Sequence, residues 1–182
     1  MKRSFDSRVD YSLLLPVFCL LVIGVVAIYI AVSHDYPNNV LPILGQQIAW
    51  IALGLVIGFV VMFFNTEFLW KVTPYLYGLG LALMVLPLVF YNPNLVASTG
   101  AKNWVSIGGT TLFQPSEFMK ISYILILARV IVQFTQKHKE WRRTIPLDFL
   151  LIIWMIGFTI PVLVLLALQS DLGTALVFVA IF

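Results

Sequence analysis

Two short polar stretches of this chain carry side chains that could do chemistry, and both adjoin long apolar runs. One runs from residue 100 to residue 120, and the other is Gln169-Ser-Asp-Leu-Gly-Thr174. Their candidate residues are Lys102, Trp104, Gln114, Ser116, Glu117, Lys120 and Asp171. A charge at the centre of a bilayer costs about 2.5–3.5 kcal/mol on insertion scales, and less near the interface. Carboxylates and ammonium groups at the edge of a membrane span are therefore default candidates for function.

Glu117 and Lys120 lie three residues apart, so on a helix they share one face and can pair. If Gln114 is the N-cap and Pro115 the first helical residue, Glu117 occupies the third position, where a carboxylate completes a capping box and meets the positive helix end. Capping alone accounts for Glu117, and both interpretations stay open. A helix that needs only capping does not need Lys120, which favours a functional pair.

Asp171 has the same two interpretations. Either Ser170 or Asp171 can cap the helix that follows, and Gly173-Thr-Ala permits close helix packing. However, Asp171, Glu117 and Lys120 all fall at one membrane edge, on helix starts that can converge. One shared polar cavity explains the three residues better than three separate capping roles.

The segment over residues 92–113 is long for a connection between helices, which favours a functional loop. Trp104 can contact a lipid headgroup in this loop, or it can be an ordinary aromatic anchor at the interface. Lys102 can bind a phosphate or be solvated. Gln114 and Ser116, at the start of the next span, are further candidates for substrate binding. Arg129 lies deeper in that span, close enough to the far edge to reach it, and we assign it to anchoring.

Composition predicts an integral membrane protein. The chain has 182 residues, of which 61% are hydrophobic and 10% charged, and its mean hydropathy is +1.00; soluble domains have about 25% charged residues. Apolar segments cover roughly residues 11–32, 43–64, 72–91, 114–134, 146–168 and 172–182. The first segment is too long for a signal peptide and is interpreted as a retained span. We predict an all-α polytopic transmembrane bundle forming one domain over residues 1–182, with five complete spans and the start of a sixth.

The distribution of lysine and arginine predicts the orientation of these spans. One side carries Lys2, Arg3, Arg8, Lys71, Lys137, Lys139, Arg142 and Arg143, whereas the other carries Lys102, with Lys120 at its edge. The positive-inside rule places the first side, and with it the N-terminus, in the cytoplasm. Residues 33–42, 92–113 and 169–174 then face outward.

Other chemistries find little support in the sequence. Cys19 is the single cysteine, so no disulfide can form within the chain. His34, Asp35 and His138 are interpreted as solvated loop residues, with nothing that pairs them into a metal site. No P-loop, catalytic Ser-His-Asp set or glycine-rich nucleotide motif is present, and no cofactor is predicted with certainty; a divalent cation is a candidate ligand of the outer carboxylates.

Three motifs in this order, Gly-Ala-Lys-Asn-Trp104, Phe-Gln-Pro-Ser-Glu-Phe-Met-Lys120 and Gln-Ser-Asp-Leu-Gly-Thr-Ala175, closely resemble the SEDS family (shape, elongation, division and sporulation). The match looks nearer to the RodA type of a Gram-positive bacterium than to the FtsW type. The resemblance covers the whole chain and the first half of a fold of roughly ten helices. The last apolar run is too short to cross a membrane, so we expect the chain to be the N-terminal part of a longer protein.

The resemblance implies a peptidoglycan glycosyltransferase that polymerises lipid II outside the cytoplasmic membrane during elongation, with a class B penicillin-binding protein as partner. Trp104 matches the family's loop tryptophan, Glu117 and Lys120 its polar pair on the fourth helix, and Asp171 the aspartate that opens the sixth. Ser170 replaces a frequent proline. The family's proposed catalytic aspartate lies in a later Pro-Glu-x-His-Thr-Asp-Phe type motif that is absent here. We therefore assign no catalytic residue to this chain and expect it to be inactive alone.

Two other functions remain as alternatives. A flippase or transporter of lipid-linked precursors would also use outer polar groups and interrupted helices, but it needs polar groups near the midplane and access from both sides. A scaffold that only recruits a penicillin-binding protein would leave Lys120 and Asp171 without a role. The concentration of polar residues at the outer edge favours the polymerase.

Overall fold

The computed structural model describes residues 11–108, 110–137 and 145–182, and it divides into two compact units, Met1–Asn65 and Thr66–Phe182. Each unit is considered by itself. That the two form a single transmembrane domain stays a prediction. Most of the basic residues behind the predicted orientation lie outside the described residues, as does His138; these are Lys2, Arg3, Arg8, Lys139, Arg142 and Arg143. The cytoplasmic N-terminus therefore also stays a prediction.

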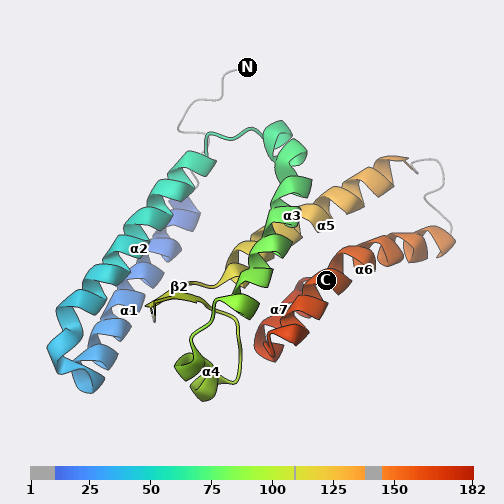
Figure 1. The fold of residues 1–182 in the computed structure, drawn as a ribbon. Coiled ribbons are helices and arrows are strands. Elements are labelled where there is room, and N and C mark those ends of the chain that lie inside the picture. Colours follow the sequence, from blue (N-terminus) through green and yellow to red (C-terminus); the bar gives the residue numbers. More distant parts are fainter. Residues whose placement is uncertain (1–10, 109, 138–144) are drawn as a thin grey trace. The chain divides into compact units, whose positions relative to one another are not determined.

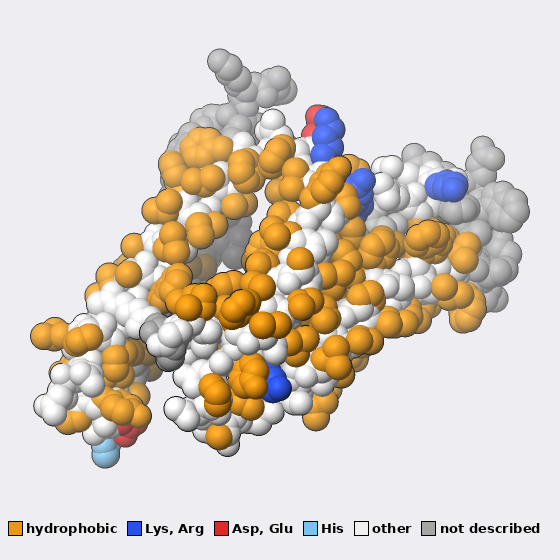
Figure 2. Space-filling view, viewed as in Figure 1, with side chains coloured by type: hydrophobic (Ala, Val, Ile, Leu, Met, Phe, Trp, Pro, Cys, Tyr) orange, Lys and Arg blue, Asp and Glu red, His pale blue; other side chains and the backbone are white. Residues whose placement is uncertain are grey.

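Long apolar helices dominate the structure, which confirms the predicted helical polytopic membrane fold (Figure 1). Among the described residues, five helices are long and apolar enough to cross a membrane; they cover Leu14–Asp35, Pro37–Val61, Thr66–Val89, Pro115–Lys137 and Phe149–Leu168. Hydrophobic side chains cover the flanks of these helices in Figure 2, where Lys, Arg, Asp and Glu gather toward helix ends. Such a surface is suited to lipid rather than water.

The first unit is a helical hairpin. Helix α1 (Tyr11–Asp35) is joined to α2 (Val40–Val61) by the 3₁₀ turn η2 (Pro37–Asn39). The turn is held by backbone hydrogen bonds from Tyr36 N to Val32 O (2.8 Å) and from Asn39 N to Tyr36 O (2.9 Å). Among the residues whose burial is described, none is buried in the spans Leu14–Asp35 and Pro37–Val61. The apolar faces of α1 and α2 are therefore available to lipid or to other helices.

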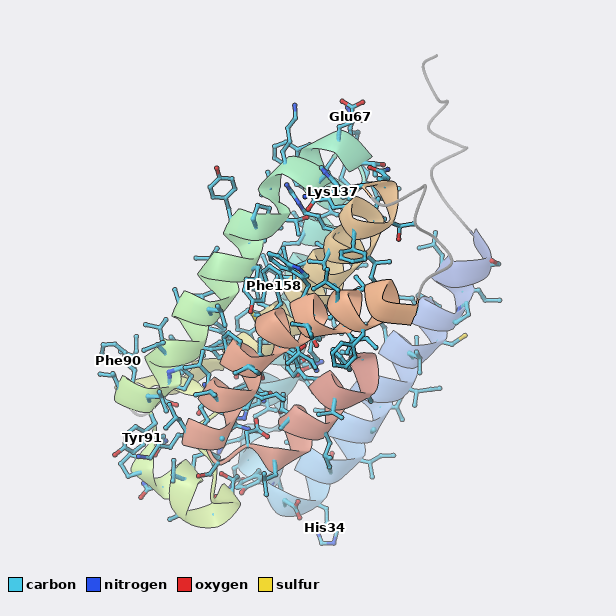
Figure 3. The ribbon with its side chains drawn as sticks, turned by 90° about the vertical axis from the view of Figure 1, so that its right-hand side faces the viewer. His34, Glu67, Phe90, Tyr91, Lys137 and Phe158 are labelled. Carbon is cyan, nitrogen blue, oxygen red and sulfur yellow. The ribbon has the colours of Figure 1, made fainter. Side chains whose placement is uncertain are left out.

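The second unit contains the buried core. Helices α3 (Thr66–Val89) and α5 (Pro115–Lys137) pack against each other, and α6 (Ile145–Leu168) and α7 (Leu172–Ile181) complete the bundle. The core consists of Tyr77, Met84, Met119, Tyr123, Ile126, Leu127, Val162, Leu166 and Phe178. Gly80 permits the close approach of α3 and α5, because a Cβ atom there would lie 2.5 Å from Sδ of Met119. In Figure 3, Glu67 and Lys137 mark one end of the α3–α5 pair, and Phe90 marks the other.

Polar side chains within the core bond to carbonyl groups near prolines. Tyr77 donates from its hydroxyl to the carbonyl of Phe158 (2.6 Å), three residues before Pro161 in α6. Gln169 donates from Nε2 to the carbonyl of Met84 (2.5 Å), three residues before Pro87 in α3. Proline lacks the N–H group that would bond the carbonyl four residues earlier, and it bends the helix on the preceding turn, where the carbonyls of Phe158 and Met84 lie. Each bond joins α3 to α6 or to the residue that follows α6, and so stabilises the packing of these helices beside a proline.

The connection between α3 and α5 contains regular secondary structure, where the sequence predicts a loop. It contains a short helix, α4 (Pro93–Thr99), and an antiparallel pair of strands, β1 (Val105–Ile107) and β2 (Thr110–Phe113). Asn92 caps α4 by accepting from Asn94 N (3.0 Å), and Gly100 ends it with φ 76°. Gly108 follows β1 with φ 61°, a conformation that favours glycine at a hairpin turn. Ser106 N donates to Phe90 O (2.9 Å), which attaches the hairpin to the end of α3.

Candidate functional site

Asp171 is the centre of the polar contacts at the start of α7. One carboxylate oxygen accepts from Thr174 N (3.0 Å), and the other accepts from the Thr174 hydroxyl (2.7 Å). These bonds make Asp171, rather than Ser170, the N-cap of the helix. An N-cap side chain satisfies amide groups that have no partner within the helix. The capping role weighed from the sequence is therefore real.

The same carboxylate also joins segments that are distant in the sequence. Oδ2 of Asp171 accepts from Asn103 Nδ2 at 2.8 Å and from Gln114 Nε2 at 3.4 Å. Asn103 belongs to the outer loop and Gln114 immediately precedes α5, so Asp171 connects both to the start of α7. Capping explains neither contact. With 7% of its surface exposed, Asp171 is a buried carboxylate that accepts four hydrogen bonds.

These contacts determine the protonation state of Asp171. Burial by itself raises the pKa of the carboxyl group, but the hydrogen bonds from the Thr174 amide, Asn103, the Thr174 hydroxyl and Gln114 outweigh burial and lower the pKa below 3.8. Hydrogen bonds donated to a carboxylate stabilise its charged form. Asp171 is therefore ionised at neutral pH and is a weak base, better suited to holding neighbouring groups than to taking a proton.

Gln169 provides a second connection between the outer loop and the bundle. Its carbonyl accepts from Lys102 N (2.8 Å), while its side chain, 1% exposed, bonds to Met84 in α3. Ser170 lies between Gln169 and Asp171 in a left-handed conformation, with φ 59°. Its N–H group donates to Ala167 O, and Asp171 N donates to Leu166 O (both 3.0 Å). These two bonds form a Schellman C-cap at the end of α6. The end of α6 thus fixes the backbone of Gln169 and Asp171, both of which bond to the outer loop.

The predicted ion pair forms on the first turns of α5. Nζ of Lys120 lies 2.8 Å and 2.7 Å from the two carboxylate oxygens of Glu117. The side chains keep 27% and 61% of their surface exposed, so the pair is accessible. Glu117 N donates to Gln114 O (3.1 Å), which confirms that α5 begins after Gln114.

Gln114 is the link between the ion pair and Asp171. Its backbone starts the helix that carries Glu117 and Lys120, and its side chain donates from Nε2 to Asp171. The structure therefore brings Asp171 together with Asn103 and Gln114, and Lys120 together with Glu117. One cavity shared by all these residues stays a prediction.

The remaining candidates differ in accessibility. Trp104 is 36% exposed at the beginning of the hairpin, and the ammonium group of Lys102 lies 4.6 Å from the centre of the Tyr91 ring. Ser116 is 1% exposed, and its hydroxyl has no hydrogen-bond partner among the described residues. In this conformation Lys102 and Trp104 can meet a ligand directly, whereas Ser116 is covered.

Sequence reasoning missed Asn103, Gln169 and Thr174. All three lie within the motifs quoted above, but a side chain amide or hydroxyl gives no signal of burial or of its partner. Asn103 Oδ1 and Gln169 Oε1 are buried without a hydrogen-bond partner among the described residues. Buried acceptors of this kind usually bind ordered water. Over the same described residues, no three His, Cys, Asp or Glu side chains come together as ligands of a metal ion.

Comparison with known proteins decides the family. The sequence profile of the FtsW, RodA and SpoVE proteins, described as cell cycle proteins, matches residues 11–182. The chain belongs to this family. Membership confirms the resemblance to SEDS proteins and covers every structural element described above, including the outer loop and the start of α7.

Individual relatives include proteins named RodA and proteins named FtsW. The chain is 28% identical over 176 residues to peptidoglycan glycosyltransferase RodA of Treponema pallidum, covering 97% of the chain and 37% of that protein. It is 28% identical over 188 residues to the probable peptidoglycan glycosyltransferase FtsW of Nitrosomonas europaea, a match that covers 98% of the chain and 45% of that protein. Stage V sporulation protein E of Bacillus subtilis is 27% identical over 177 residues, a match that covers 93% of the chain and 44% of that protein. Equal identities to RodA and FtsW do not separate elongation from division.

One solved structure has a similar fold. A chain of a peptidoglycan synthase complex that coordinates polymerization and crosslinking superposes with a TM-score of 0.63 at 27% sequence identity. The match covers 93% of the present chain and 44% of that chain. The chain therefore spans less than half the length of each of these four proteins.

Proposed function

We propose that this protein acts in peptidoglycan glycosyl transfer, polymerising lipid II at the outer face of the cytoplasmic membrane. The family match over residues 11–182, among relatives named peptidoglycan glycosyltransferases, carries this conclusion. Elongation and shape maintenance, the role of the RodA type, are our preferred context. The predicted cytoplasmic N-terminus supports an outer location for Asp171 and the Glu117–Lys120 pair.

The chemistry sets what the outer residues must do. Glycosyl transfer from a lipid pyrophosphate needs a base for the acceptor hydroxyl and positive charge for the departing pyrophosphate. Lys120 supplies the positive charge, and Glu117 holds its ammonium group at the membrane edge. Hydrogen bonds donated to a developing anion by preorganised groups are worth about 2.7–4 kcal/mol each.

Asp171 acts as a positioning residue in this proposal. Four hydrogen bonds occupy its oxygens and lower its pKa, which makes it unsuited to act as the base. Instead it bonds to Asn103 of the outer loop and to Gln114 at the start of α5, and so holds these two segments together. The base would come from the later aspartate motif of the family, outside this sequence.

Lys102 and Trp104 are the proposed contacts of the substrate's lipid-proximal groups. Trp104 is exposed on a loop that follows a membrane span, at a level where indole rings favour the interface. Lys102 already contacts the ring of Tyr91, and its backbone amide bonds to Gln169, so its ammonium group is carried on a fixed backbone. Gln114 and Ser116 act behind these contacts, by supporting the loop and the start of α5.

A class B penicillin-binding protein is the proposed partner. The solved structure with a similar fold comes from a peptidoglycan synthase complex, which supports a complex of this kind here. Membrane lipids surround the apolar helices. A precursor transporter remains the competing function, and the experiment below separates it from a polymerase.

The test uses the complete protein that contains these residues, reconstituted with its penicillin-binding partner in liposomes that hold fluorescent lipid II. Formation of glycan strands, resolved by gel electrophoresis, is the expected result. The same liposomes report transport when a membrane-impermeant reagent quenches lipid II that reaches the outer leaflet. Translocation without strands would replace the polymerase by the transporter, and strands without translocation would exclude the transporter.

A further inference from the structure

A wide, open surface cavity of about 450 Å³ lies at the end of the second unit that is remote from Asp171. It lies between the start of α3 and the end of α5 and is lined by Thr66, Glu67, Trp70, Lys71, Val132 and Gln136. Cavities of roughly 300–1,000 Å³ are the size that binds small ligands. Since α3 and α5 are membrane-spanning helices, their ends lie at the level of lipid headgroups. None of the proposed glycosyl-transfer residues lines this cavity.

The lining combines one negative and one positive side chain. Glu67 and Lys71 are four residues apart on the first turns of α3, and both side chains line the cavity. The ion pairs recorded among the described residues involve other side chains, His34 with Asp35 and Lys120 with Glu117. Thr66 adds a hydroxyl and Gln136 an amide, whereas Trp70 and Val132 give an apolar wall. A ligand that carries both charges on a small polar group would satisfy this set.

Arg129 holds the apolar wall in place. Its guanidinium group donates a hydrogen bond to the carbonyl of Trp70 and lies 5.3 Å from the centre of the Trp70 ring. The contact joins α5 to α3 directly beside the cavity, at a residue, Trp70, that lines it. The sequence predicts that Arg129 reaches the membrane edge as an anchor; in the structure its guanidinium group bonds α5 to α3. Trp70 is thereby fixed at the level where indole rings meet headgroups.

We propose that this cavity binds the headgroup of a zwitterionic phospholipid that carries a primary amine, of the phosphatidylethanolamine class. Lys71 binds the lipid phosphate, and Glu67 accepts hydrogen bonds from the ammonium group, to which Gln136 also presents its amide oxygen. An anionic headgroup such as phosphatidylglycerol leaves Glu67 without a cation and is repelled by it. A choline headgroup has no N–H to donate to Glu67. By the positive-inside prediction, the lipid belongs to the cytoplasmic leaflet.

The test measures lipid retained by the complete protein. Nanodiscs of equimolar phosphatidylethanolamine, phosphatidylglycerol and phosphatidylcholine supply the lipids, and native mass spectrometry identifies those that stay bound after detergent extraction. We expect phosphatidylethanolamine to be enriched roughly three- to tenfold over the others, the net effect of one typical hydrogen bond at a partly exposed site. Equal retention of the three lipids by the parent protein, or enrichment of phosphatidylglycerol, would overturn the proposal.

Variants assign the selectivity to the two charges. Glu67→Gln should abolish the preference for phosphatidylethanolamine over phosphatidylglycerol, and Lys71→Gln should reduce retention of both. Lys137→Gln removes a lysine from the last turn of α5, where it does not line the cavity, and should leave retention unchanged. Thermal unfolding of each variant checks the fold. Unchanged selectivity in a folded Glu67→Gln protein would contradict the site.

Discussion

Asn103 donates a hydrogen bond of 2.8 Å to the carboxylate of Asp171, which lies 68 residues later in the chain. The bond connects the outer loop to the residue that caps α7. Because Gln114 bonds to the same oxygen, the start of α5 is included in the connection. One buried carboxylate therefore joins the outer loop directly to the start of the helix that carries the Glu117–Lys120 pair.

Replacing Asn103 by alanine should loosen the outer loop while leaving the helices intact. The substitution removes a hydrogen bond to a charged group, which typically contributes about 1.5–3 kcal/mol. Hydrogen exchange of the amides in residues 100–108 should become faster, and exchange within α3 and α5 should not change. Asn94→Ala is the matched control, because Asn94 is exposed in α4 of the same connection. Equal exchange in both variants would show that the bond to Asp171 does not hold the loop.

Acid should weaken the same connection. The folded structure lowers the pKa of Asp171 below 3.8, so its ionised form stabilises the fold. This contribution is complete above the pKa of the unfolded chain and is lost as the pH falls through the lower folded-state pKa. We expect the midpoint of thermal unfolding in detergent to fall more steeply below about pH 4 in the parent than in Asp171→Asn. Parallel curves for the two proteins would contradict the ionised, hydrogen-bonded carboxylate.

The packing of α3 against α5 should not accept a side chain at Gly80. A Cβ atom would lie 2.5 Å from Sδ of Met119 and 3.0 Å from the hydroxyl of Ser122, and Met119 is fully buried. Overpacking of this kind costs about 1–3 kcal/mol, so Gly80→Ala should lower the midpoint of thermal unfolding. Gly78→Ala, on the same helix with no atom within 4 Å of the added methyl group, should be neutral or slightly stabilising. A Gly80→Ala protein as stable as Gly78→Ala would show that the helices do not approach so closely.

Ser170 should prefer glycine and reject proline. A left-handed conformation costs a non-glycine residue about 1–2 kcal/mol, so Ser170→Gly should raise stability by a similar amount. Proline fixes φ near −65° and removes the N–H group that bonds to Ala167, whereas Ser170 has φ 59°. Ser170→Pro should therefore lower the unfolding midpoint. The reverse order of stabilities would mean that the loop between α6 and α7 has a different backbone conformation, closer to that implied by the proline frequent elsewhere in the family.

Much of the fold could be predicted because apolar runs of about 20 residues have few structural solutions in a membrane. The predicted spans match the helices closely, although α3 begins at Thr66 rather than near residue 72. Hydropathy locates the apolar run, which begins after Lys71, but the polar first turn continues the same helix. The strands β1 and β2 were not predicted, since three or four residues give too short an alternating pattern.

The site was predicted in part. Spacing alone predicts the pairing of Glu117 with Lys120, because both lie on one helix. The contacts of Asp171 with Asn103 and Gln114 depend on how three distant segments meet, and local sequence does not encode this. Likewise, the role of Arg129 in holding Trp70 follows from the crossing of α3 and α5, which hydropathy cannot give.

The most direct test of the account compares strand synthesis by the complete protein and its variants, using labelled lipid II with the penicillin-binding partner. Lys120→Ala should lower the rate by about 10²–10³-fold through loss of charge stabilisation, with partial recovery in Lys120→Arg. Asp171→Ala should lower it by about 10²-fold through displacement of the loop. Lys137→Gln should retain the parental rate. Parental rates from stably folded Lys120→Ala and Asp171→Ala proteins would contradict the assignment of this outer site to glycosyl transfer.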